Sequence, residues 1–142
     1  MIKVVNTGER RFSPVMTLRQ YTLIHASAVG KAVLAENPME YVHDIIEGLR
    51  RHTQNTLTDR KTLLEELKKI REWGYATTDG ESRDGIQAAA RVVQGSNQGA
   101  LGSISIYGPT YNFPSYEIVA ETLLPAVDEL EEEIRSRWKK EL

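Results

Sequence analysis

The stretch from His25 to Ala35 constrains the fold of this chain more than any other, because small residues dominate it. It reads HASAVGKAVLA, with four alanines and one glycine. Ser27 is a typical helix N-cap residue, whose side-chain oxygen accepts a hydrogen bond from an amide two or three positions later. The stretch therefore predicts a helix that begins after Ser27 and lies close to its neighbours.

The first turn of this helix would consist of Ala28, Val29 and Gly30. Backbone amides in a first turn have no partner within the helix, and the helix dipole makes this end favourable for anions. Small side chains would let a carboxylate or phosphate approach those amides. Two interpretations stay open here: an anion-binding turn, or a capped helix that packs tightly against a sheet.

Further helices are predicted along the chain. One occupies residues 58–74 and closes at Gly74, with leucines recurring on one face at helical spacing. Another begins at Ser115 and contains Pro125, which should kink the helix or mark a restart. A third is expected at 38–48. The apolar stripes on these helices predict that they cover a common core.

A β-hairpin is predicted between the two longer helices. Residues 86–93 and 100–107 have strand character, and a glycine-rich turn separates them. On the second strand apolar and hydroxyl residues alternate, so one face should be core and the other should face a pocket, water or a neighbouring subunit. Shorter strands are expected at 2–5, 12–16 and 75–78. The pattern predicts one α+β domain, with a central antiparallel sheet flanked by helices.

Composition excludes several classes of function. The chain has 142 residues, a net charge of −2 and no cysteine. This length suits one domain, and the charge gives no reason to expect that the chain itself binds nucleic acid. The absence of cysteine excludes disulfides, thiolate catalysis and cysteine-based zinc sites. No apolar run approaches the roughly 18 residues that a membrane span needs, and no signal peptide is evident, so we expect a cytoplasmic protein.

Catalytic and metal-binding motifs are missing from the sequence. The three histidines show no metal-ligand spacing, and there is no GxSxG or GxxxxGK motif. We therefore expect no enzyme activity, no cofactor and no metal. His25 should pack under its helix with a ring nitrogen bonded to the backbone, and Lys31 should be a surface or salt-bridging lysine. The loop with Glu81, Arg83 and Asp84 either closes over a ligand or is a solvated surface loop.

A set of segments follows in a fixed order along the chain. They read HASAVGKAVLA at 25–35, TQNTLT at 53–58, LLEELKKIREWGYA at 63–76, the acidic loop through Glu81, DGIQAAA at 84–90 and GSISIYGP at 102–109. This ordered set resembles the effector-binding domain of the IclR family of transcription regulators. The resemblance covers most of residues 20–125. It implies a GAF-like domain that binds a small organic acid effector and assembles as a homodimer or tetramer.

The resemblance also implies where the effector would bind. The family's contacts come from the start of the HASA helix, the end of the strand after GYA, the following strand, and the strand before the final GP. On this chain the effector-binding positions are Ala28, Val29, Gly30, Thr78, Asp79, Ala88, Ser105 and Tyr107. Thr78 and Ala88 stand where a carboxylate and a larger group can occur in the family, and Tyr107 where a small hydroxyl residue can.

Residues 1–142 are expected to form a single IclR-type effector-binding domain without the N-terminal winged helix-turn-helix of complete family members. DNA would be contacted only through that missing domain, and no membrane contact is expected. Two functions stay open: a ligand-sensing regulatory domain, or a stand-alone GAF-like interaction module that pairs with other regulator subunits and has a vestigial pocket. An open cavity at Ala28 and Val29 would favour the first, and a cavity filled by Tyr107 the second.

Overall fold

The computed structural model describes residues 24–38, 42–43, 46–95 and 99–137. The strands expected at 2–5 and 12–16 lie outside the described residues, as does part of the helix expected at 38–48. The elements in chain order are α1 (Ala28–Ala35), α3 (Arg60–Trp73), β1 (Ala76–Asp79), β2 (Ile86–Gln94), β3 (Ala100–Pro109), the 3-10 helix η2 (Thr110–Asn112) and α4 (Tyr116–Arg137).

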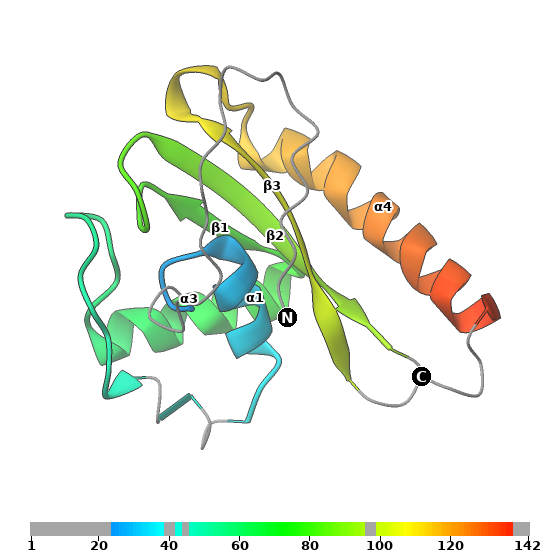
Figure 1. Ribbon diagram of the computed structural model, residues 1–142, viewed down its shortest axis with the longest axis horizontal. Coiled ribbons are helices and arrows are strands. Elements are labelled where there is room, and N and C mark those ends of the chain that lie inside the picture. Colours follow the sequence, from blue (N-terminus) through cyan, green and yellow to red (C-terminus); the bar gives the residue numbers. More distant parts are fainter. Residues whose placement is uncertain (1–23, 39–41, 44–45, 96–98, 138–142) are drawn as a thin grey trace.

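The three strands form an antiparallel sheet in the order β1-β2-β3. Helices α1 and α3 lie on one face of this sheet and α4 runs along the other (Figure 1). The predicted α+β fold with a central antiparallel sheet flanked by helices is confirmed. β1 is short and pairs with β2 over four positions, from Ala76–Ala90 to Asp79–Gln87.

Each face of the sheet has its own hydrophobic core, because side chains alternate along a strand. On β2, Ala88, Ala90 and Val92 face α1 and α3, whereas Ala89 and Val93 face α4. The core under α1 and α3 also contains Ala28, Ala32, Leu34, Leu63, Leu67, Ile70 and Ala76. The core under α4 also contains Val119, Leu123 and Val127.

Local signals set the ends of the helices as predicted. The Ser27 side chain accepts a hydrogen bond from the Gly30 amide at 3.1 Å, and Asp59 caps α3 through the Thr62 amide at 3.0 Å. Gly74 ends α3 with a φ of 81°, which glycine adopts without strain. The restart proposed for the last helix is wrong, since α4 continues through Pro125. Pro125 is exposed, so the backbone carbonyl that it leaves unbonded can meet water.

Candidate ligand-binding site

Three predicted site residues form a row across the sheet. Thr78 on β1 is paired with Ala88 on β2, and Ala88 is paired with Tyr107 on β3. Ser105, two residues before Tyr107, is on the same face and opposite Ala90. The row lies on the face of the sheet that α1 covers, because Ala28, Val29, Ala88 and Tyr107 belong to one packed cluster. The structure therefore brings the helix and sheet parts of the predicted site together.

Asp79 does not join this row. It is the next residue on β1 after Thr78, so its side chain takes the opposite direction in the pleat, and it is exposed. Its backbone faces the neighbouring loops, through an amide bonded to Glu81 and a carbonyl bonded to Asn55. Of the two alternatives at this point of the predicted site, the geometry favours Thr78.

The hydroxyl of Tyr107 is the orphan polar group of this site. Its oxygen is buried, and none of the residues that the structure describes gives it a hydrogen-bond partner. A buried hydroxyl left without a partner costs about 1–3 kcal/mol. Its neighbour across the sheet is Ala88, whose side chain is small and cannot satisfy it. The phenol is thus a polar group of the row whose hydrogen-bonding capacity is unused among the described residues.

The first turn of α1 offers fewer free amides than the sequence suggested. The Gly30 amide is occupied by the Ser27 cap, which leaves those of Ala28 and Val29 without a partner inside the helix. Gly30 has a different role, because a Cβ at this position would lie 2.2 Å from the carbonyl oxygen of Ile24. The turn is therefore also in close backbone contact with Ile24, which precedes α1 and does not belong to the sheet.

A buried ionic cluster lies next to this turn. Lys31 is completely buried, so the prediction of a surface lysine is wrong, whereas that of a salt-bridging lysine is confirmed. Its Nζ lies 2.9 Å from Glu81 Oε1 and 3.2 Å from Glu66 Oε1. Burial raises the pKa of the Glu81 carboxyl, and the Lys31 ammonium opposes that effect. The cluster joins α1, α3 and the loop after β1.

The loop after β1 is divided between burial and solvent. Glu81 is buried, whereas Arg83 and Asp84 are exposed, so neither of the two predicted descriptions fits the whole loop. The segment 53–56 holds the buried part in place. The Thr56 hydroxyl donates to the Glu81 carbonyl at 2.6 Å, and the Thr53 hydroxyl donates to the Gly80 carbonyl.

His25 lies directly before α1 and is buried as predicted. Its Nε2 lies 2.8 Å from the Arg50 carbonyl, to which the ring N–H donates. The ring of His52 lies 5.8 Å away, measured between ring centroids. Burial lowers the pKa of His25, since the charged ring would lose its hydration. The residue fixes the chain entering α1 to the segment around Arg50.

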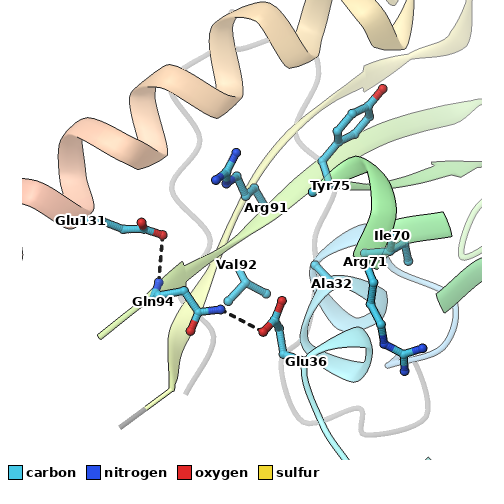
Figure 2. Close-up of a pocket in the computed structure, with 10 residues that line it drawn as sticks. Ala32, Glu36, Ile70, Arg71, Tyr75, Arg91, Val92, Gln94 and Glu131 are labelled. Carbon is cyan, nitrogen blue, oxygen red and sulfur yellow. Dashed lines mark hydrogen bonds between the residues drawn. The ribbon is translucent and has the colours of Figure 1, made fainter. Parts of the chain in front are cut away.

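A separate pocket of about 140 Å³ lies at the opposite end of α1 (Figure 2). It is lined by Ala32, Glu36, Ile70, Arg71, Gly74, Tyr75, Arg91, Val92, Gln94 and Glu131. Gln94 connects two residues that line the pocket: its side chain donates to Glu36 and its backbone amide donates to Glu131. None of the predicted site residues lines this pocket.

The described side chains include no evident metal site. Across the described ranges, no group of three or more His, Asp or Glu side chains is placed to hold a metal ion. In the same part of the chain, no helix has both the length and the hydrophobicity needed to cross a bilayer.

Comparison with known proteins identifies the family. Residues 2–135 match the family described as bacterial transcriptional regulator IclR, C-terminal. The HTH-type transcriptional repressor AllR of Escherichia coli strain K12 is 33% identical over 100 residues, which are 69% of this chain and 37% of AllR. This chain thus spans little more than a third of the length of that relative.

Solved structures agree with this assignment. The C-terminal domain of the E. coli transcriptional regulator KdgR superimposes with a TM-score of 0.68 at 29% identity, over 78% of this chain and 70% of that one. The inducer-binding domain of a double mutant of PobR from Acinetobacter, in complex with 3-hydroxybenzoic acid, gives a TM-score of 0.70 at 26% identity, over 76% and 65% of the two chains. These relatives are transcription regulators and not enzymes. The chain belongs to the IclR family of bacterial transcriptional regulators and carries its C-terminal domain.

Proposed function

We propose that this chain is the ligand-sensing domain of a transcription regulator and that it binds a small organic acid beneath α1. The observation that carries this proposal is the buried Tyr107 hydroxyl, which has no partner among the described residues. A ligand that accepts a hydrogen bond from it would remove the cost of the orphan group. The 3-hydroxybenzoic acid bound to the PobR domain supports an acid as the class of ligand.

The acid would be held by backbone amides and hydroxyls rather than by a cation. Its carboxylate would accept from the amides of Ala28 and Val29 at the start of α1, where the helix dipole favours negative charge. Ser105 and Tyr107 would donate from β3, with Thr78 at the far end of the row. Ala88 keeps the middle of the row small. Gly30 would shape the turn through its contact with Ile24 and its bond to Ser27 and would not contact the acid, and the Asp79 side chain would take no part.

The remaining expectations concern the whole regulator. AllR is named an HTH-type repressor, which supports a parent protein that reaches DNA through a helix-turn-helix domain and not through this one. We also propose self-association through this domain, as a homodimer or tetramer, and a cytoplasmic location alongside the DNA. The alternative, an interaction module with a vestigial pocket, has less support, because a Tyr107 that only filled space would gain nothing from a buried hydroxyl.

The test is titration calorimetry with pyruvate, glyoxylate and 3-hydroxybenzoate. Tyr107→Phe removes only the orphan hydroxyl, so Kd should rise by about fivefold, which corresponds to about 1 kcal/mol. The free energy of unfolding of the free protein should stay the same or increase, since the hydroxyl has no partner there among the described residues. This opposite effect on binding and on stability identifies a ligand contact.

Ser105→Ala should weaken binding by a similar factor. Ser103→Ala is the matched control on the same strand, because its hydroxyl donates to the Arg91 carbonyl at 3.2 Å. A bulky residue at Ala28 is a poorer test, since Ala28 is buried and a larger side chain would overpack the core. If no acid binds, the interaction module becomes the better proposal. If an acid binds and Tyr107→Phe and Ser105→Ala bind it as tightly as Ser103→Ala, the acid site lies elsewhere in the domain.

A further inference from the structure

One carboxylate joins the two halves of the candidate site. Glu81 Oε1 lies 2.9 Å from Nζ of Lys31, and Glu81 Oε2 accepts a hydrogen bond from the Asp79 amide at 3.1 Å. Lys31 lies one helical turn after Ala28 on α1, and Asp79 directly follows Thr78 on β1. The helix and sheet parts of the site are therefore connected through a single side chain.

The backbone of this connection is fixed from the other side. Thr56 donates to the Glu81 carbonyl at 2.6 Å, Thr53 donates to the Gly80 carbonyl, and Asn55 Nδ2 donates to the Asp79 carbonyl at 3.1 Å. Successive carbonyls from 79 to 81 are thus bonded to side chains of one short segment. Because these bonds hold residues 79–81 together as one unit, a displacement of α1 that pulls on Glu81 also acts on the end of β1.

The need to neutralise Lys31 does not by itself explain why Glu81 is buried beside it. Lys31 already has a second carboxylate in Glu66, at 3.2 Å, and the Glu66 side chain is 24% exposed compared with 11% for Glu81. Glu66 would neutralise the lysine with a smaller loss of hydration. Glu81 differs in that its second oxygen also holds the backbone at the end of β1. Its distinctive feature is this second bond.

We propose that Glu81 is a positioning residue of the candidate site, coupling α1 to the end of β1 so that the two respond together to a bound ligand. The inference rests on the proposed function for the ligand, but the coupling itself exists in the free protein. It assigns a role to the TQNTLT segment, which holds the coupled loop in place, and to the buried lysine.

The test compares Glu81→Gln with Glu66→Gln by amide hydrogen exchange. Each variant removes one carboxylate and leaves Lys31 with the other, so the charge change is the same. The glutamine of Glu81→Gln would place an NH2 donor where one carboxylate oxygen was, so either Lys31 or the Asp79 amide would face a donor instead of an acceptor. We expect exchange at Asp79 and in α1 to rise by about tenfold or more in Glu81→Gln and by less than about twofold in Glu66→Gln. Amides of α4 should not change in either.

Equal exchange in the two variants, or no change at Asp79 in Glu81→Gln, would overturn the coupling. If Glu81→Gln does not fold, Thr56→Val loosens the same loop without a charge change. Faster exchange should then reach α1, and a change confined to residues 79–81 counts against the proposal.

Adding 3-hydroxybenzoate, pyruvate or glyoxylate separates this inference from the proposed function. If none of them binds but the two variants differ as expected, the function is wrong and the coupling stands. If an acid protects α1 in the unmodified chain and leaves Asp79 unprotected, the coupling is wrong and the function stands.

Discussion

The two faces of the sheet use the same strands for different purposes. The core toward α4 is apolar and consists of Ala89, Val93, Val119, Leu123 and Val127. The side toward α1 combines alanines with the buried polar residues Lys31, Thr78 and Glu81 and the orphan hydroxyl of Tyr107. Apolar burial stabilises a fold whatever is bound, whereas buried polar groups need specific partners. The α4 face therefore contributes apolar burial alone, whereas the α1 face, whose core also contains Leu34, Leu63 and Leu67, adds polar groups that need partners.

The largest loss in the free energy of unfolding is expected from Lys31→Met, on the α1 face. Glu81 would keep a buried carboxylate without its ammonium, and breaking a buried ion pair from one side costs about 3–5 kcal/mol. Urea denaturation measures the free energy of unfolding. Lys69→Met, at an exposed position of α3, is the control and should change it by less than about 0.5 kcal/mol. If the two variants have the same free energy of unfolding, the polar cluster does not contribute to the stability of the α1 face.

The pH dependence of the same variant sharpens this prediction. Because burial raises the pKa of Glu81 above its ordinary value of 4.5, the folded protein binds this proton more tightly than the unfolded chain does. The stability contributed by that proton is complete below 4.5 and is lost as pH rises through the raised pKa. Lys31→Met should therefore be less destabilising at about pH 5 than at about pH 7, and adding Glu81→Gln should remove this difference.

A substitution on the α4 face should separate stability from binding. Leu123→Ala leaves a cavity in an apolar core and should lower the free energy of unfolding by about 3 kcal/mol. The affinity of the folded protein for an organic acid, measured by calorimetry well below the melting temperature, should not change. Loss of affinity in a folded Leu123→Ala protein would show that the two faces are not independent.

The smallest effect is expected from the titration of His25. Burial lowers its pKa below the ordinary value of 6.5, so its contribution to stability is complete above 6.5 and is lost as pH falls through the lowered pKa. His25→Gln keeps a donor for the Arg50 carbonyl but cannot titrate. Its free energy of unfolding should fall less than that of the unmodified chain between about pH 6.5 and about pH 5. His43→Gln is the control, and parallel curves for His25→Gln and the unmodified chain would contradict the prediction.

Features determined by neighbouring residues could be predicted from the sequence. Ser27, Asp59 and Gly74 mark helix ends because each acts on amides or carbonyls within one turn. The hairpin of β2 and β3 follows from the glycine-rich turn between two segments of strand character and from the alternation along β3. The helix and sheet parts of the candidate site were brought together by the family resemblance, and the pairing of Thr78, Ala88 and Tyr107 then fixed their register.

Features that depend on distant residues could not be predicted. Lys31 is separated from Glu66 by 35 residues and from Glu81 by 50, so no local pattern indicates the cluster. One signal was present: Lys31 lies three residues after Ala28 and four before Ala35, on the inward side of α1. The orphan Tyr107 hydroxyl likewise appears only when side chains are placed in three dimensions.

The contact between Gly30 and Ile24 sets a boundary for redesigning this domain toward new ligands. Any side chain at Gly30 would collide with a main-chain carbonyl, which no choice of rotamer can relieve. Hydroxyl positions such as Ser105 and Tyr107 carry no such restriction and can be varied for chemistry. A library aimed at altered ligand preference should therefore diversify the sheet side of the site and keep the helix turn unchanged.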